Sequence, residues 1–272
     1  MGAIGVFDSG VGGLTVLREL RRALPAEDFI YLGDTARLPY GTKSAATVAR
    51  YSLQCAAVLV ARGIRCLVVA CNTASASALS ALRAQYPHLP VIGVIEPGAA
   101  AAVAASASQC IGVIATEGTI GGGAYQDAIR RLNPRAQVSA RACSLFVALA
   151  EEGLTHGPIV EAVAHRYLSP FFEAAQPPDT LVLGCTHFPV LAPVMRAVIP
   201  AGVRIVDSAA TTAAALRRQL QPSADAGAGA GAGTGAGRTT WLATDGAARF
   251  ARVGSIFLGE PLCAEAVEVV DL

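Results

Sequence analysis

The sequence predicts an α/β protein made of two pseudo-symmetric, doubly wound domains, and three observations support this. Short apolar runs alternate with segments of helical periodicity, which is typical of a parallel sheet covered by helices. The pattern begins at Ile4-Gly-Val-Phe-Asp-Ser9 and restarts in similar form at Ile111-Gly-Val-Ile-Ala-Thr116. In each half, one apolar strand runs into a cysteine that is followed by polar residues. We therefore expect two related units with an active site in the cleft between them.

The first unit is predicted to begin with a strand at 4–7 and a glycine-rich turn at 8–13. The turn leads into a helix with Leu14, Leu17 and Leu20 at helical spacing. Pro39 and Gly41 indicate a fixed loop before the next helix, which Ser44 can cap. Further strands are expected at 29–32, 64–70 and 91–95, the last ended by Glu96-Pro97, and further helices up to 61 and at 74–85.

The second unit is predicted to repeat this plan from residue 111, with a second glycine-rich turn at 121–123 leading into a helix. Strands are expected at 137–141, 181–184 and 203–206, and helices at 144–152, 158–172 and 209–220. Residues 223–237 are almost entirely Gly and Ala, which is typical of a low-complexity linker. A strand at 239–244 and a helix after Asp245 follow. We expect one domain at 1–97 plus about 209–272, containing the linker, and a second at 98–208.

Composition excludes several classes of function. The chain is 53% apolar and 15% charged with a net charge of +1, so neither disorder nor nucleic-acid binding is indicated. Seven cysteines without a C-x-x-C pair, with only four histidines, favour neither a disulfide framework nor a metal site. Arg62 and Arg65 interrupt the most apolar region, and the N-terminus lacks a basic signal-peptide region. We expect a cytoplasmic protein without metal or membrane contact.

The two strand-end cysteines carry the chemistry. Cys71 ends one apolar run and Cys185 ends another, and in open α/β sheets ligands bind at the carboxyl ends of strands. A thiol and a thiolate on opposite sides of a cleft can remove an α-proton from an amino acid and return one to the other face. Asp8 ends the first strand, where it can lie near Cys71, and His187 is two residues from Cys185, so either residue could accept or relay protons. No Schiff-base lysine and no cofactor motif is apparent.

Other interpretations of these residues remain open at this point. Free cysteine is among the most buried residue types, so each cysteine taken alone fits a core position. Cys185 and His187 also fit the nucleophile and base of a hydrolase. The turn at 8–13 matches neither dinucleotide-binding nor P-loop spacing, which favours a small anion such as a carboxylate over a nucleotide. The remaining cysteines and histidines lack a strand-end polar context.

Over nearly its whole length the chain resembles the glutamate racemases, cofactor-independent enzymes of the aspartate/glutamate racemase superfamily. The resemblance rests on six motifs that are specific together: Asp8-Ser-Gly-Val-Gly-Gly-Leu-Thr15, Leu38-Pro-Tyr-Gly-Thr-Lys-Ser44, Ala70-Cys-Asn-Thr-Ala-Ser75, Gly93-Val-Ile-Glu-Pro97, Ala115-Thr-Glu-Gly-Thr119 and Leu183-Gly-Cys-Thr-His187. It implies interconversion of L- and D-glutamate by two thiols without a cofactor, and supply of D-glutamate for peptidoglycan synthesis. We also expect a homodimer.

The resemblance also implies roles for individual residues. Cys71 and Cys185 become the acid/base pair, the first facing D-glutamate and the second L-glutamate. Asp8 would support Cys71, and Glu151 and His187 would support Cys185. The substrate-binding positions implied are Asp8, Ser9, Tyr40, Gly41, Asn72, Thr73, Thr186 and His187, with Thr116 and Thr119 as additions. The chain departs from the family pattern at Ala148, Phe188 and Gly122-Gly123, which bears on where Glu151 lies.

Two alternative functions are consistent with the same residues. A sister racemase acting on aspartate or a hydantoin would keep both thiols and change the binding loops. A non-catalytic two-domain protein that binds an amino acid would have no need of two strand-end thiols.

Overall fold

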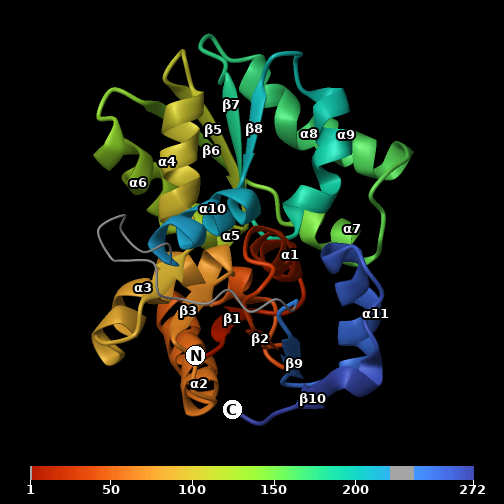
Figure 1. Cartoon of the computed structure of the whole chain (residues 1–272). Helices are drawn as coiled ribbons and strands as arrows, with labels where there is room; N and C mark the ends of the chain where they lie inside the picture. Colours follow the sequence, from red (N-terminus) through yellow and green to blue (C-terminus); the bar gives the residue numbers. More distant parts are fainter. Residues whose placement is uncertain (1, 221–235) are drawn as a thin grey trace.

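The computed structural model describes residues 2–220 and 236–272 and arranges their strands in two parallel sheets (Figure 1). The larger sheet has the order β10-β9-β2-β1-β3-β4, and every pairing in it is parallel. Its strands are β1 Ile4–Asp8, β2 Phe29–Gly33, β3 Cys66–Val69, β4 Val91–Gly93, β9 Thr239–Ala243 and β10 Val267–Val269.

The smaller sheet repeats the topology of the first. Its order is β6-β5-β7-β8, all parallel, which matches β2-β1-β3-β4 strand for strand. Its strands are β5 Cys110–Ala115, β6 Gln137–Ala142, β7 Thr180–Gly184 and β8 Arg204–Asp207. The fold class predicted from the sequence, including the internal duplication, is confirmed. In each sheet the chain reverses its winding direction beside the central strands, at β1/β3 and at β5/β7, where ligands bind in this architecture.

Helices cover both sheets and fill the space between them (Figure 1). Within the second lobe, α4 and α6 lie on one side of the sheet and α8 and α9 on the other, while α1 and α10 lie between the lobes. The helices are α1 Leu14–Ala23, α2 Ala45–Ala61, α3 Asn72–Gln85, α4 Ile95–Ala105, α5 Glu117–Gly121, α6 Ala124–Leu132, α7 Leu145–Glu151, α8 Pro158–Phe172, α9 Ala192–Val198, α10 Ser208–Leu220 and α11 Ala247–Leu258, with 3-10 turns η1 Tyr40–Thr42, η2 Phe188–Leu191 and η3 Ala264–Ala266.

The core follows the two-residue alternation of the strands. Val6 and Val68 face one side of the first sheet and join a core that continues into the second lobe through Val113 and Val182. Phe7 and its neighbours on the other face pack beneath α2 and α3 in a separate cluster. The core shared by the two lobes therefore packs against both β3 and β7 and includes Cys185, while Cys71 belongs to the separate cluster.

One predicted element is wrong. The fourth strand ends at Gly93, and residues 95–105 form α4, where the sequence had indicated a strand to 95 and a stop at Glu96-Pro97. Proline is tolerated in the first turn of a helix because the N–H groups there have no partner inside the helix. Glu96 is also favourable there beside the positive end of the helix dipole. The dipeptide opens a helix here.

The last part of the chain returns to the first sheet. β9 pairs with β2 over Phe29 to Gly33, and β10 pairs with β9. α10 packs against both α1 and α4, so it contacts both lobes. The domain boundaries near residues 97 and 208 stay a prediction. Most of the linker predicted at 223–237 lies outside the described residues.

No helix among residues 2–220 and 236–272 combines the length and the apolar character that crossing a membrane requires.

Candidate active site

Cys71 lies at the junction of β3 and α3. It is the N-cap residue of α3, and its sulfur accepts a hydrogen bond from the Ala74 N–H at 3.4 Å. The Cys71 thiol donates to the Ser9 hydroxyl at 3.5 Å. A helix N-terminus is a site where negative charge on sulfur is stabilised. The local sequence explains the position: β-branched residues end at Val69, and the small residues from Asn72 onward begin the helix.

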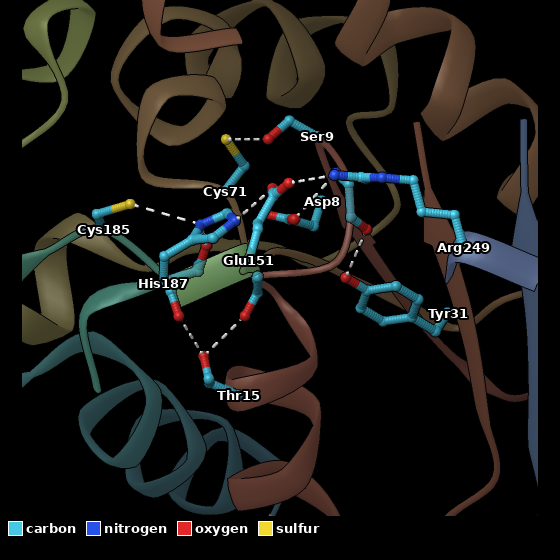
Figure 2. Close-up of polar contacts among 12 residues, drawn as sticks. Asp8, Ser9, Thr15, Tyr31, Cys71, Glu151, Cys185, His187 and Arg249 are labelled. Atoms are coloured by element: carbon cyan, nitrogen blue, oxygen red, sulfur yellow. Dashed lines mark hydrogen bonds and ion pairs between the residues drawn. The ribbon is translucent and has the colours of Figure 1, made fainter. Parts of the chain in front are cut away.

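Cys185 occupies the equivalent place in the second sheet, directly after β7. Its sulfur lies 3.7 Å from Nδ1 of His187, and Figure 2 shows the imidazole between the Cys185 and Glu151 side chains. Both cysteines are nearly buried and both reach the same pocket. The two strand-end thiols predicted from the sequence are therefore brought together from the two lobes.

The shared pocket has a volume of about 300 Å³. It contains most of the predicted site residues, and among the described residues that line it there is no lysine or arginine. The lining consists of Ser9, Leu38, Pro39, Tyr40, Gly41, Thr42, Cys71, Asn72, Thr73, Thr116, Ser144, Val147, Ala148, Glu151, Gly184, Cys185, Thr186 and His187. Any anion bound here must be held by neutral hydrogen-bond donors, by helix N-termini and by His187 when its ring is charged.

Hydroxyl and amide groups on one wall of the pocket are ordered by contacts between the lobes. The hydroxyls of Thr73, Thr116 and Thr119 lie 3.0 to 3.1 Å from one another. Asn72 accepts a hydrogen bond from the Tyr125 hydroxyl at 2.8 Å and donates one to the Ser208 hydroxyl at 3.4 Å, which fixes the orientation of its amide. Thr119 is almost fully buried and does not line the pocket, so it acts through the other two threonines.

The loop at 38–42 is anchored from behind. The buried carboxylate of Asp34 accepts hydrogen bonds from the Tyr40 hydroxyl, from Nε of Arg37 at 2.7 Å and from the Thr244 hydroxyl at 2.9 Å. Burial raises the pKa of Tyr40 far above its ordinary value, so the phenol stays protonated. Because its hydroxyl is taken by Asp34, Tyr40 offers a ligand its backbone and ring, and the first N–H groups of η1 have no partner inside that turn.

His187 is one of three charged side chains, His187, Glu151 and Arg249, that contact one another in a row. Its Nε2 donates to Glu151 Oε1 at 3.0 Å, and the other oxygen of Glu151 accepts from Arg249 at 2.7 Å. Burial would lower the pKa of His187, but its contacts with Cys185 and Glu151 outweigh burial and raise it to about 10. Burial would raise the pKa of Glu151, but the hydrogen bonds from His187 and Arg249 lower it to about 2. The imidazolium therefore faces the Cys185 sulfur at neutral pH.

The surroundings of Cys71 differ from those of Cys185. Burial and the carboxylate of Asp8 raise the pKa of Cys71 to about 12. Asp8 is itself fully buried; burial raises its pKa, whereas His187 and the backbone N–H groups of the glycine-rich turn lower it. Its Oδ2 accepts from the Gly10 N–H at 3.0 Å, and its Oδ1 has no hydrogen-bond partner among the described residues. The Cys71 side thus favours the protonated thiol.

The pair of His187 and Glu151 predicts a pH dependence of stability. The pKa of His187 is raised from 6.5 to about 10, so its contribution is complete below pH 6.5 and is lost as the pH rises toward 10. The pKa of Glu151 is lowered from 4.5, so its contribution is present above pH 4.5 and is lost in more acidic solution. We expect Glu151→Gln to lower Tm by about 4 °C between these limits. Calorimetry should show that this difference narrows as the pH approaches 10, and a pH-independent difference would contradict the charge pair.

Gly12 lets the glycine-rich turn approach His187 closely. A Cβ atom at this position would lie 2.4 Å from the His187 ring and 2.5 Å from the Thr186 hydroxyl oxygen. Beside it, the Thr15 hydroxyl donates to the Thr186 carbonyl at 2.9 Å (Figure 2), so this part of the first lobe contacts the turn after Cys185. Glycine is needed here because of space, since the residue does not have a left-handed conformation.

We predict that Gly12→Ala displaces the His187 ring and lowers kcat/KM more than about tenfold, since small misplacements of catalytic groups are costly. Gly10→Ala is the matched control, because a Cβ there meets only Leu38, at an ordinary 3.4 Å. Steady-state kinetics on both variants, with melting curves to exclude unfolding, checks this. Equal activity of the two variants would show that the close approach is unimportant.

Several residues that shape the site had not been predicted from the sequence. Ser144, Val147 and Ala148 line the pocket together with Glu151, and their spacing of three and four places them on one face of a helix. That spacing is a signal which could have found them once Glu151 was identified. Asp34 and Arg249 act from outside the pocket and belong to no motif. Asp8 is the one predicted catalytic residue that does not line the pocket, because it is buried beneath the turn that covers it.

A larger and more open groove, of about 1040 Å³, lies between α3, α4 and α6. Arg83, Arg130 and Arg131 line it, but neither cysteine reaches it. The smaller pocket is the better candidate because it contains the two thiols and the strand ends at the switch points.

The chain is similar to known proteins over most of its length. The family model described as Asp/Glu/hydantoin racemase matches residues 4–216. A glutamate racemase of Geobacter metallireducens is 53% identical over 260 residues, covering 96% of this chain and 94% of that protein. The crystal structure of a glutamate racemase isoform from Bacillus anthracis has a TM-score of 0.90 at 35% identity, covering 100% of this chain and 98% of that one.

A second solved structure adds a ligand. The glutamate racemase of Francisella tularensis, in complex with D-glutamate, has a TM-score of 0.87 at 35% identity and covers 99% of this chain and 97% of that one. The match of the family model over most of the chain and the similarity to these relatives over almost their full length lead to one conclusion: the chain belongs to the Asp/Glu/hydantoin racemase family.

Proposed function

We propose that this protein interconverts L- and D-glutamate by a two-thiol mechanism that needs no cofactor. The observation that carries the proposal is the placement of Cys71 and Cys185 at equivalent strand ends of two duplicated sheets, both reaching one pocket. Inversion at one carbon requires a base on one face and an acid on the other. The relatives named glutamate racemases support glutamate as the substrate.

In the proposed reaction, Cys185 as thiolate removes the α-proton of L-glutamate, and the Cys71 thiol donates a proton to the opposite face. D-glutamate reacts in the reverse sense, with Cys71 as base and Cys185 as acid. The charged His187 beside Cys185 stabilises negative charge on that sulfur, while the raised pKa of Cys71 favours its protonated form. This arrangement suits a reaction that starts from L-glutamate. After turnover of L-glutamate, Cys185 carries the proton and Cys71 is the thiolate. Proton exchange with solvent restores the starting state.

The substrate would be held by neutral groups together with the charged ring of His187. Ser9, Asn72, Thr73 and Thr186 suit the ammonium and carboxylate of the amino-acid head group, and Thr116 with the backbone of Tyr40 and Gly41 suits the second carboxylate. Thr119 would orient Thr73 and Thr116. Asp8, buried beneath the glycine-rich turn, would support Cys71 from behind the pocket.

Incubation of L-glutamate with the protein in deuterated water tests the proposal. Circular dichroism should fall to zero while deuterium enters Cα, with EDTA present and no added pyridoxal phosphate. Exchange without loss of optical activity would point to a one-base reaction. Absence of both would favour the alternative of a non-catalytic binding protein.

The cellular role belongs to the same proposal. D-glutamate produced here would serve peptidoglycan precursors, in agreement with the bacterial relatives of the same name. All seven cysteines are free, which suits a reducing cytoplasm. We also propose a homodimer. Light scattering of the purified protein measures its mass directly. A monomeric mass would refute the dimer and leave the proposed racemase reaction unaffected.

A further inference from the structure

Arg249 lies at the outer end of the charged chain that leads to Cys185. Its Nη2 donates to Glu151 Oε2 at 2.7 Å, Glu151 Oε1 accepts from His187 Nε2 at 3.0 Å, and His187 Nδ1 lies 3.7 Å from the Cys185 sulfur (Figure 2). Arg249 itself is half-exposed and does not line the pocket. It therefore reaches the reacting sulfur only through the other two side chains.

The Arg249 contact also crosses from one lobe to the other. Arg249 stands in the first turn of α11, which follows β9 of the larger sheet, whereas Glu151 ends α7 of the second lobe. Further along α11, the Phe257 ring packs edge-on against the His187 ring, with centroids 4.9 Å apart. One helix of the first lobe thus fixes both the imidazole and the carboxylate that orients it.

Glu151 needs such a partner to hold a single orientation. A carboxylate bound only through one oxygen can rotate, whereas here each oxygen has its own charged donor. Arg249 fixes the second oxygen, and the first oxygen then fixes the imidazole ring. Because proton transfer depends steeply on geometry, a fixed imidazole should make proton transfer at Cys185 faster.

We propose that Arg249 is a positioning residue for proton transfer at Cys185 and has no part in proton transfer at Cys71. The inference rests on the proposed racemase function and adds a residue to it. Cys71 is held by the Ser9 hydroxyl and the Ala74 N–H, and Arg249 contacts neither of them. Loss of Arg249 should therefore slow proton transfer at Cys185 and leave proton transfer at Cys71 unchanged.

The two directions cannot differ in kcat/KM, because L- and D-glutamate have equal free energies in water. Isotope effects can still separate the two faces. If transfer at Cys185 becomes slower, removal of the α-deuteron from L-glutamate becomes more rate-limiting and its primary isotope effect rises. Removal from D-glutamate by Cys71 then becomes a reversible step before the slow one, and its isotope effect falls.

The test compares Arg249→Gln with Arg252→Gln, an exposed arginine one turn further along the same helix. We expect Arg249→Gln to lower kcat/KM about tenfold in both directions with little change in KM. The isotope effects for α-deuterated L- and D-glutamate should move in opposite directions. Arg249→Lys, which keeps the charge and one hydrogen bond, should recover most of the activity, and Arg252→Gln should behave as wild type.

A double variant completes the test. If Arg249 acts through Glu151, adding Arg249→Gln to Glu151→Gln should lower kcat/KM almost no further. If the two residues act independently, the two losses in kcat/KM should multiply. Multiplied losses, or isotope effects that move together for both enantiomers, would overturn the inference. An inactive wild-type protein would instead refute the proposed function. Melting curves for each variant separate loss of folding from loss of positioning.

Discussion

Cys71→Ala and Cys185→Ala will each abolish racemisation in both directions, with kcat/KM reduced about ten-thousandfold or more, since each variant loses a general base or acid outright. Each sulfur is the base for one enantiomer and the acid for the other, so neither variant can retain a one-way activity. Polarimetry or circular dichroism from each pure enantiomer measures this. Both cysteines are buried at strand ends and lie in one pocket, which is the geometry that the expectation depends on.

Cys143→Ala is the matched control for these two variants. Cys143 is also buried, but it does not line the pocket, and its thiol is directed to the Arg141 carbonyl. It should retain most of the wild-type rate. Racemisation that persists in either active-site variant, or an equal loss in Cys143→Ala, would contradict the assignment.

Serine variants separate the two faces. Serine keeps the shape of the side chain but is a poor base, so the variant should slow transfer at its own face and leave the other nearly intact. With Cys71→Ser, the isotope effect on α-deuterated D-glutamate should rise and that on L-glutamate should fall. With Cys185→Ser the pattern should reverse. Identical patterns in both variants would rule out the handedness assigned to the two thiols.

Local patterns were sufficient to predict most of the fold and to single out the two cysteines that the structure brings to one pocket. Apolar strands that end in Cys71 and Cys185 are visible in the sequence because a strand, its last residue and the following helix are contiguous. The restart at Ile111 predicted the duplication that the strand orders confirm. The error at Glu96-Pro97 arose because the same dipeptide can end a strand or open a helix, and only the packing of α4 between α6, α10 and the second sheet decides between them.

The supporting contacts could not be predicted because they join distant parts of the chain. Glu151 and Arg249 are separated by 98 positions, and Asp34 and Thr244 by 210. No periodicity connects such residues, and their pairing depends on how α11 and β9 return to the first lobe. The need for glycine at position 12 depends likewise on where His187 lies, 175 residues later in the chain.

The loop at 38–42 and Thr116 form the rim of the pocket and are held in fixed positions. This leads to a prediction about the length of the substrate. The loop at 38–42 is tied to buried Asp34, and Gly41 packs so closely on Thr116 that a Cβ would lie 2.8 Å from the Thr116 Cβ. Gly118 approaches the Gly41 carbonyl in the same way. The donors for the second carboxylate therefore cannot move far toward a shorter ligand.

We accordingly expect aspartate to be at least about a hundredfold worse than glutamate in kcat/KM, which corresponds to roughly 2.7 kcal/mol of transition-state stabilisation. Aspartate is one methylene shorter, so with its α-carbon between the two sulfurs its second carboxylate cannot reach the rim. The neutral donors there would stay unpaired, which costs more than the lost methylene itself. A long cationic side chain could bridge such a gap, but no lysine or arginine is among the described residues that line the pocket.

2-Aminoadipate, one methylene longer than glutamate, provides the matching test from the other side. It should also be a poor substrate, because its extra length would press against the fixed loop or draw the α-carbon away from the sulfurs. Rates for the three homologues, measured by chiral chromatography under identical conditions, should therefore peak at glutamate. A site that merely preferred apolar bulk would instead favour the longest homologue, and comparable rates for aspartate and glutamate would mean that the rim does not select length.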